Sequence, residues 1–418
     1  LPFEPENTIA WPTGAEYGDP AAFGRAVVLE LNGDYSSDAV VLAGGKVVAL
    51  WDAYVYDSAT PITSLTGVVD IAALPILGPE TKDVLLVTNA TGLLSITASD
   101  YTFSAPGVVA RGNWIGAGPI HVDDLDGDGL DDVIGVEASH LAVHTRIGNG
   151  SGFPAGPSFP VGVQVFDALS IDWANDGTRE LAVLASDGLH VYSLLGAPPI
   201  FVPDNSTFGS LARIEDEQSI EVLAWVSSAV GGAELVVLND TLQESALPLT
   251  FAACNLGSFV PTAILAGKYD GDRADELMLV DSSRREAVVL QNLSAQGQVP
   301  HFAPTESDAY DIIRLSAGVP SAGGVGLPAF AQLDFEGSDD VLVAVNANSA
   351  SVTVQRSLPT IRAGGGKAAS STDVLIFNTE YTAGTGTSAP PPYYGQLRQA
   401  IAVPSTYLGF TDAEIRVW

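Results

Sequence analysis

One pattern occurs seven times along the chain: an acidic residue followed at once by four or five mostly apolar residues. Successive copies are 42 to 64 residues apart. The acids that begin the copies are Asp38, Asp83, Asp132, Glu180, Glu234, Glu276 and Asp340. Because one repeat of this length cannot bury a core alone, the pattern is typical of folds in which neighbouring units pack against each other.

The apolar runs have the composition of short buried strands. They are rich in Val, Leu and Ile, and Gly, Asp, Asn and Pro bound them. In two units a glycine-containing turn leads directly into a further strand: Gly44-Gly45 precedes residues 46–51, and Asp187-Gly188 precedes residues 189–194. No segment shows a sustained helical period with caps. Seven units with room for about four strands each predict an all-β fold, a seven-bladed β-propeller of four-stranded blades.

The 418 residues then fit one large architecture with short ends. We predict an N-terminal segment over residues 1–22, the propeller over residues 23–380, and a Pro/Gly-rich linker with a C-terminal tail over residues 381–418. Residues 373–378 are predicted to form the outer strand of the seventh blade. The tail either closes the ring beside the N-terminal segment or begins a separate element.

The loop before the third copy carries the strongest chemical signal. In the sequence VDDLDGDGLDDV, positions 1, 3, 5 and 9 are Asp124, Asp126, Asp128 and Asp132. Alternate side chains of a turning loop point toward one centre, where four carboxylates repel one another unless a cation lies among them. Ca²⁺ takes about six to eight oxygen ligands in a forgiving geometry, and the carbonyl of Leu130 at position 7 would add another. We therefore predict a calcium-binding loop, distinct from an EF-hand because flanking helices and the final glutamate are missing.

Four other loops fit the same register to different degrees. The first and seventh loops have oxygen-bearing side chains at positions 1, 3, 5 and 9. The fourth loop has Ala174 at position 3, and the sixth has Lys268 at position 1. The predicted calcium ligands, including the residues at position 7, are Glu30, Asn32, Asp34, Ser36 and Asp38 in the first loop, Asp172, Asp176, Thr178 and Glu180 in the fourth, Asp270, Asp272 and Glu276 in the sixth, and Gln332, Asp334, Glu336, Ser338 and Asp340 in the seventh.

The second and fifth copies keep only the acid, Asp83 or Glu234, and the residues before it cannot hold calcium. An acid that persists without the other ligands needs another role. We expect it to accept hydrogen bonds from backbone N–H groups of its own loop, as acidic residues in turns do. This structural role is the alternative to metal binding in every loop.

With these motifs the chain resembles the FG-GAP/VCBS repeat family, whose repeats build the propeller of integrin α-subunits, many bacterial surface proteins and a seven-bladed fungal lectin. The stretch from Asp124 to Asp132 is close to the calcium loop of that family, and Phe23-Gly24 and Gly116–Pro119 are similar to its name-giving residues. The resemblance covers residues 20–360 and fades in the second and fifth units. It implies calcium loops between the first two strands of a blade, on one rim, and ligand binding by a propeller face or a blade cleft.

The charge of the chain limits its partners. It has 50 acidic residues against 17 Lys and Arg, a formal net charge of −33, so its net field disfavours nucleic acid and anionic lipid. A single cysteine excludes an internal disulfide framework and a cysteine-based zinc site. No apolar run is long enough to predict membrane insertion. Residues 1–20 do not resemble a signal peptide, and a start without Met fits a processed exported chain or a cloned fragment.

Several other residues have structural explanations. The five histidines are expected to be solvated or to lie in the core, and the tryptophans Trp51, Trp114, Trp173 and Trp225 to pack between blades, with sugar stacking as the alternative. The sequence contains no nucleophile elbow, phosphate-binding loop or dinucleotide motif.

Together these observations predict a calcium-binding recognition or adhesion module rather than an enzyme. We expect it to be secreted or at the cell surface, with the periplasm also compatible, and to bind a glycan, as a lectin does, or a protein. Two alternatives stay open: a polysaccharide lyase or hydrolase on a propeller scaffold, and a structural part of a larger surface assembly. The fold itself does not choose among them.

Overall fold

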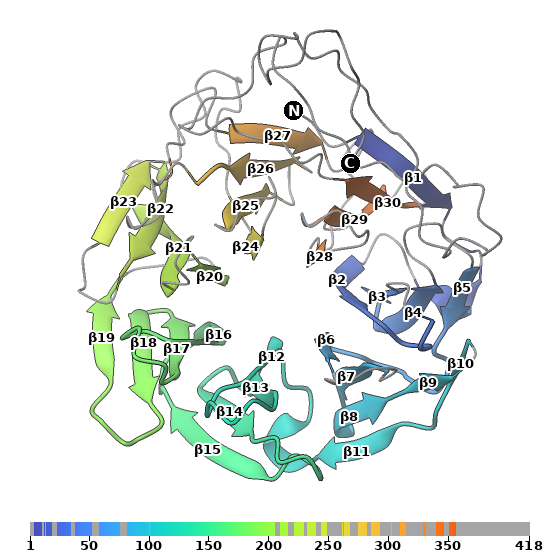
Figure 1. Cartoon of the computed structure of the whole chain (residues 1–418), viewed down its shortest axis with the longest axis horizontal. Helices are drawn as coiled ribbons and strands as arrows, with labels where there is room; N and C mark the ends of the chain where they lie inside the picture. Colours follow the sequence, from blue (N-terminus) through green and yellow to red (C-terminus); the bar gives the residue numbers. More distant parts are fainter. Residues whose placement is uncertain are drawn as a thin grey trace, which may run out of the picture.

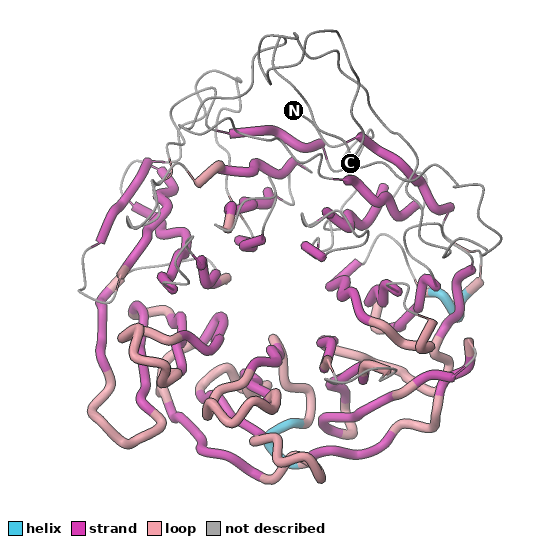
Figure 2. Tube along the Cα trace, in the orientation of Figure 1, coloured by secondary structure: helices cyan, strands magenta, loops and turns pink. Residues whose placement is uncertain are grey.

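The computed structural model describes residues 4–356 with gaps, and residues 357–418 lie outside the description. The gaps are residues 11, 13, 19–22, 35–37, 52–57, 76–81, 100, 205–209, 216–220, 230–231, 240–243, 249–260, 262, 268–274, 282–285, 293–301, 303–309, 315–328, 332–339 and 347–350. Within these limits the chain is an all-β propeller whose antiparallel sheets stand around a common centre as blades (Figures 1 and 2). The helical elements described are two short 3₁₀ turns, η1 (Ala15–Tyr17) and η3 (Gly112–Trp114).

Six blades are formed by strands in chain order, with the first strand innermost. These strands are β2 (Phe23–Leu29), β3 (Asp38–Ala43), β4 (Lys46–Trp51) and β5 (Ser58–Pro61) in blade one; β6 (Asp70–Leu74), β7 (Val84–Asn89), β8 (Gly92–Ile96) and β11 (Gly107–Ala110) in blade two; β12 (Ile120–Asp123), β13 (Asp132–Val136), β14 (Ala142–Arg146) and β15 (Ala155–Pro160) in blade three; β16 (Val165–Ile171), β17 (Glu180–Ala185), β18 (Gly188–Ser193) and β19 (Ile200–Pro203) in blade four; β20 (Leu211–Glu215), β21 (Glu221–Ala229), β22 (Gly232–Leu238) and β23 (Glu244–Pro248) in blade five; and β24 (Ala263–Gly267), β25 (Glu276–Asp281), β26 (Glu286–Leu290) and β27 (Tyr310–Arg314) in blade six. A small hairpin of β9 (Ala98–Ser99) and β10 (Thr102–Phe103) separates β8 from β11.

The remaining four-stranded sheet combines the two ends of the described chain, and we call it the composite sheet. It consists of β28 (Ala329–Ala331), β29 (Asp340–Asn346), β30 (Ser351–Arg356) and, at its outer edge, β1 (Glu4–Ala10). The strand β1 is antiparallel to β30, with Glu4 opposite Arg356 and Ala10 opposite Ser351. In Figure 1 the blue β1 lies directly beside the red-brown β30.

The composite sheet corrects two predictions, and a third lies outside the described residues. The repeat predicts seven blades from seven consecutive units, but six blades are of this kind. Residues 1–22 are not a segment apart from the propeller, because they supply β1. The outer strand of the composite sheet is β1, whereas residues 373–378 and the tail over 381–418 lie outside the described residues. Pairing the first strand with the last holds both ends of the described chain in one sheet, which closes the ring and explains the arrangement physically.

The core is a series of apolar layers between adjacent blades. Separate clusters of buried side chains join blades one and two, two and three, three and four, four and five, and five and six. The second strands are covered on both faces, so β3 and β13 are buried at every position and their apolar residues are continuous rather than alternating.

The four tryptophans confirm the prediction that they pack between blades. Trp51, Trp114, Trp173 and Trp225 are each at most 4% exposed. The first lies in the layer between blades one and two, the second between blades two and three, and the other two between blades four and five. No tryptophan among these four presents a face to a sugar.

A close contact of Trp114 leads to a stability prediction. A Cβ atom at Gly135 in β13 would be 2.5 Å from Cζ3 of Trp114, which is too close for two carbon atoms. Because the buried indole has no space to move into, Gly135→Ala is expected to reduce the free energy of unfolding by about 1–3 kcal/mol. Urea denaturation measures the effect. At the exposed Gly107 the nearest atom is a serine hydroxyl, so Gly107→Ala is the control and should change stability by less than about 0.5 kcal/mol. Equal stability of the two variants would contradict the prediction.

Candidate metal centre

The candidate metal centre is the loop between the two innermost strands of blade three. The strands β12 and β13 pair up to their ends, where Asp123 is opposite Asp132. The loop therefore starts and finishes at one end of the blade. The corresponding loop of blade four is its neighbour, since a Cβ atom at Gly127 would be 4.0 Å from the carbonyl oxygen of Gly177.

Hydrogen bonds to the backbone hold the acidic side chains of this loop in place. Asp124 Oδ1 accepts the N–H groups of Gly127 and Asp128 at 2.8 and 3.1 Å, and its Oδ2 accepts that of Gly129 at 2.8 Å. Asp126 Oδ1 accepts the N–H of Asp128 at 3.2 Å. Gly127 and Gly129 have φ angles of 78° and 83°, a conformation that favours glycine.

The structure brings three of the predicted ligands together. Asp124, Asp126 and Asp128 each offer a carboxylate oxygen, and these oxygens all lie within 4.8 Å of one another. Asp126 and Asp128 are exposed, whereas Asp124 is half-buried. Over the described residues, this is the one group of three or more His, Cys, Asp or Glu side chains with such a geometry. Leu130 lies in the same loop and donates its N–H to Asp128 Oδ1 at 2.8 Å.

Asp132, the fourth predicted carboxylate, has a different environment. Its side chain is fully buried, Oδ2 accepts the N–H of Leu125 at 2.9 Å, and Oδ1 accepts that of Gly148 at 2.6 Å. Burial raises the pKa of Asp132 to about 6, although the backbone hydrogen bonds act in the opposite direction. Burial also raises the pKa of the adjacent Asp131, and the nearby Asp123 adds to the effect.

The hydrogen bond from position 2 to the acid at position 9 recurs in two other loops. In blade one, Asp38 Oδ2 accepts the N–H of Leu31 at 3.0 Å. In blade four, Glu180 Oε2 accepts the N–H of Trp173 at 3.1 Å, and burial raises the pKa of Glu180. We call the acid at position 9 the closing acid. Its predicted structural role, accepting backbone N–H groups of its own loop, is thus confirmed in blades one, three and four.

The loop of blade four repeats the design of blade three with one acid fewer. Asp172 Oδ1 accepts the N–H of Asp176 at 3.0 Å, and its Oδ2 accepts that of Gly177 at 2.9 Å. Asp176 Oδ1 accepts the N–H of Thr178 at 2.9 Å. Ala174 contributes no ligand, so only two carboxylates stand at positions 1, 3 and 5.

The loop of blade one has fewer carboxylates than that of blade three, because an amide, Asn32, stands at position 3, and an amine, that of Lys82, lies nearby. Glu30 Oε1 accepts the N–H groups of Asn32 and Gly33 at 3.1 and 2.7 Å. Asn32 Nδ2 donates to Asp34 Oδ2 at 2.8 Å. The stem of Lys82 lies against the loop, because a Cβ atom at Gly33 would be 3.0 Å from its Cε atom.

The other predicted ligands are only partly described. Glu276 is fully buried as the first residue of β25, and Asp340 is the first residue of β29. The remaining predicted ligands lie outside the described residues: Ser36, Asp270, Asp272, Gln332, Asp334, Glu336 and Ser338.

Two of the seven repeat acids occupy other places than predicted. Glu234 lies in β22, the third strand of blade five, whereas the second strand begins at Glu221. Asp83 precedes β7, and strand pairing puts Val84 at the place that Asp132 occupies in blade three. The two errors differ in kind. An acid before an apolar run does not specify which strand of a blade follows, so Glu234 was assigned to the wrong strand, whereas Asp83 precedes the expected strand and is one residue out of register.

Acids near the start of the second strand also join neighbouring blades, a role that sequence reasoning missed. The N–H of Glu30 donates to Asp83 Oδ2 at 2.7 Å, and the N–H of Asp83 donates to the carbonyl oxygen of Glu30 at 2.7 Å. Glu215 and Asp275 form the same reciprocal pair at 2.7 and 2.9 Å. The two partners of each pair are a full repeat apart in the chain, so no local spacing reveals them. The one available sequence signal is that Asp83 and Asp275 each stand one residue before the position of the closing acid.

Comparisons with known proteins agree with the fold. No protein-family model matches the chain, and no curated protein matches its sequence. Crystal structures of BBS1N in complex with ARL6DN, soaked with mercury or with lead, have TM-scores of 0.56 and 0.55 at 13% and 14% identity. They cover 87% and 84% of this chain and 99% and 98% of theirs. An Agrocybe aegerita lectin that recognises non-reducing terminal N-acetylglucosamine has a TM-score of 0.43 at 14% identity, over 67% of this chain and 79% of that chain. At such identities the BBS1N structures show a shared propeller fold. Within the described residues, no helix is long and apolar enough to cross a bilayer.

Proposed function

We propose that the protein is a calcium-binding recognition module: a seven-bladed propeller of the FG-GAP/VCBS type, with the composite sheet as its seventh blade. The observation that carries the proposal is the blade-three loop, where Asp124, Asp126 and Asp128 place three carboxylate oxygens within 4.8 Å of one another. Three negative charges at this spacing repel each other, and a divalent cation relieves that repulsion. Calcium suits the site because its ligands are hard oxygens and the loop is pre-formed by backbone hydrogen bonds.

The proposed setting is extracellular, with a glycan or a protein as the ligand. Loops of this kind with moderate affinity are filled by the calcium levels found outside cells. BBS1N, which shares the architecture, is bound to ARL6DN in its crystal structures, so a protein ligand suits such a scaffold. The net charge of −33 repels nucleic acid, so we propose a ligand of another class.

Calcium titration tests the metal site. We expect calcium to raise the melting temperature of the protein relative to EDTA, because an ion that binds only the folded state stabilises it by about 2.7 kcal/mol at a hundredfold excess over Kd. Asp128→Ala should abolish most of this shift. Glu16→Ala removes an exposed acid of η1 outside the loops and should leave the shift intact. Identical melting curves in calcium and EDTA would refute a calcium site in this loop.

A glycan array with and without calcium tests the recognition function. Calcium-dependent retention of a glycan without release of product supports a binding module. Turnover of a polysaccharide would instead identify an enzyme. If no glycan is retained, the protein ligand is tested by affinity capture from extracellular fractions in calcium, with the Asp128→Ala variant as the control.

A further inference from the structure

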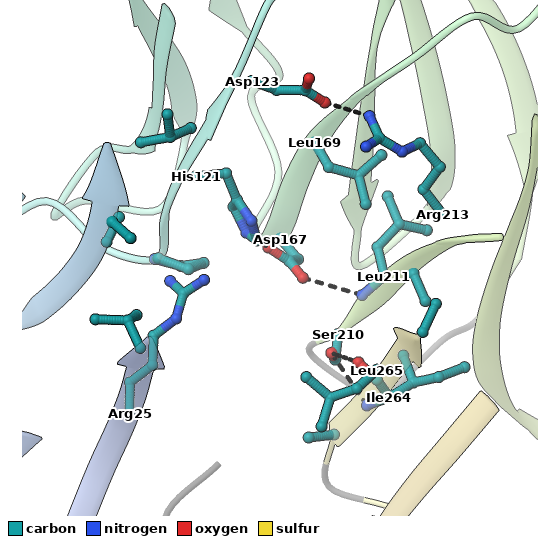
Figure 3. A pocket seen from close by; sticks show the side chains of 18 of the residues that line it. Arg25, His121, Asp123, Asp167, Leu169, Ser210, Leu211, Arg213, Ile264 and Leu265 are labelled. Atoms are coloured by element: carbon teal, nitrogen blue, oxygen red, sulfur yellow. Dashed lines mark hydrogen bonds and ion pairs between the residues drawn. The ribbon is translucent and has the colours of Figure 1, made fainter. Parts of the chain in front are cut away.

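A cavity of about 500 Å³ lies at the centre of the ring, between the innermost strands of the six consecutive blades. Its walls come from β2, β6, β12, β16, β20 and β24. Figure 3 shows its charged and polar side chains, among them Arg25, His121, Asp123, Asp167 and Arg213. A space of this size is typical of small-molecule sites in proteins.

The acids of the cavity are already supplied with donors from the protein. Asp167 Oδ1 accepts hydrogen bonds from His121 Nε2 at 2.7 Å and from the N–H of Ala168 at 2.9 Å. Its Oδ2 accepts the N–H of Leu211 at 3.0 Å. With both oxygens occupied, Asp167 has little capacity for a cationic ligand.

Asp123 is equally engaged. Its Oδ2 forms an ion pair with Arg213 and accepts the Ser170 hydroxyl, and its Oδ1 accepts the N–H of Asp124 at 3.0 Å. Arg179 Nη1 lies 3.6 Å from the same Oδ2. This end of the cavity is therefore a closed network of opposite charges.

Arg25 differs because it has donors to spare. Its Nη1 donates to Asp70 Oδ2 at 3.1 Å and to the carbonyl oxygen of Ile120 at 2.7 Å. No described residue accepts a hydrogen bond from its Nε or Nη2. The Arg25 side chain is 24% exposed, and its hydrogen bond to the carbonyl of Ile120 places it close to the next residue, His121 (Figure 3). In a chain with so few cationic residues, an arginine with unused donors in a central cavity marks a place for an anion.

Much of the remaining cavity wall is aliphatic. The apolar lining residues include Val28, Ala73, Val122, Leu169 and Leu265. An anionic group with a carbon body therefore fits better than a bare inorganic ion, because the body covers these walls while the anion meets the arginine. The planar fork of a guanidinium matches a carboxylate, which accepts two parallel hydrogen bonds.

We propose that the central cavity binds a small organic carboxylate, held at its charged end by Arg25 and packed against the aliphatic walls by a short carbon chain. The cavity adjoins the blade-three loop only at Asp123, and the proposed ligand contacts Arg25, so its binding does not require the metal. His121 lies beside the carboxylate and is held in position by Asp167.

Isothermal titration with hexanoate tests this proposal. We expect saturable binding with a Kd on the order of 1 mM or tighter, in calcium and in EDTA alike. Hexanol, hexylamine and inorganic phosphate each lack one half of the proposed ligand and should bind at least about tenfold more weakly. Absence of hexanoate binding, or equal binding of any of the three other compounds, overturns the proposal.

Matched variants locate the site. Arg25→Gln should weaken hexanoate binding at least about tenfold, because the charged partner of the carboxylate is lost. Arg111→Gln makes the same charge change at an exposed position outside the cavity and should bind as the wild type does. If Arg25→Gln binds hexanoate normally, the proposal is wrong.

A measurement on the wild type covers the case in which Arg25→Gln does not fold. Crystals soaked with 6-bromohexanoate should show an anomalous bromine peak within the central cavity, with the carboxylate at Arg25. A peak elsewhere, or none at all, overturns the assignment.

Discussion

Trp225→Ala is expected to lower the free energy of unfolding by about 3–5 kcal/mol, among the largest effects of any single substitution in this chain. Trp225 is 1% exposed in the apolar layer between blades four and five, so removal of the indole leaves a cavity that the hydrogen-bonded sheets on either side cannot close. The substitution also removes the donor that Trp225 Nε1 provides to Asp204 Oδ2 at 2.6 Å. Asp204 would retain the hydroxyl of Ser227, at 2.7 Å from its Oδ1.

Urea denaturation of three variants separates the two contributions. Trp225→Phe keeps most of the apolar volume but loses the N–H, so its loss of stability should be smaller than that of Trp225→Ala. Leu195→Ala is the surface control, because Leu195 is 83% exposed and its truncation should cost less than about 0.5 kcal/mol. A loss below about 1 kcal/mol for Trp225→Ala would show that the layer between these blades is not a packed core.

Deletion of β1 is expected to have the second large effect. Without residues 4–10, the composite sheet loses its outer strand, and the backbone groups of β30 that pair with β1 lose their partners. Six paired positions at about 0.5–1 kcal/mol each correspond to a loss of about 3–6 kcal/mol. The exposed edge of β30 should also pair with other molecules, so we expect oligomers in size-exclusion chromatography as well as a lower melting temperature.

Two controls make the deletion informative. Deleting residues 1–3 alone leaves β1 intact and should change neither the melting temperature nor the elution volume. A synthetic peptide of residues 1–12, added to the protein that lacks β1, should restore stability by adding a strand to the free edge, whereas a scrambled peptide of the same composition should not. A monomeric deletion variant of normal stability would contradict the pairing of β1 with β30.

Local sequence features predicted the parts of the fold that depend on local contacts. The run after Asp132 is apolar because β13 is buried on both faces, and the glycine turn at Gly44-Gly45 does connect β3 to β4. The closing acids accept the N–H groups of residues seven positions earlier in the chain. Donor and acceptor therefore lie in the same loop, where the sequence shows them at a fixed spacing.

Contacts between distant residues account for what the sequence did not reveal. The strand EPENTIA contains proline and two acids and has no apolar run, so only its partner β30 makes it a strand. The cavity residues Arg25, His121 and Arg213 come from three different blades, and none belongs to a motif. In blade five β20 ends at Glu215 and β21 already begins at Glu221, so the loop between the first two strands is short. The repeat pattern therefore matched Glu234 in the third strand instead of Glu221 at the start of the second.

The pairing of Glu4 with Arg356 also has a consequence for biosynthesis. Among the described strands β1 is synthesised first, and it has to wait, unpaired, until nearly all the described residues have been translated. The six consecutive blades can assemble one after another in the meantime, because each needs only strands that are near in the chain. An open horseshoe with two unmatched ends must therefore precede the finished ring, and protection of those ends during translation becomes a requirement for a good yield of protein.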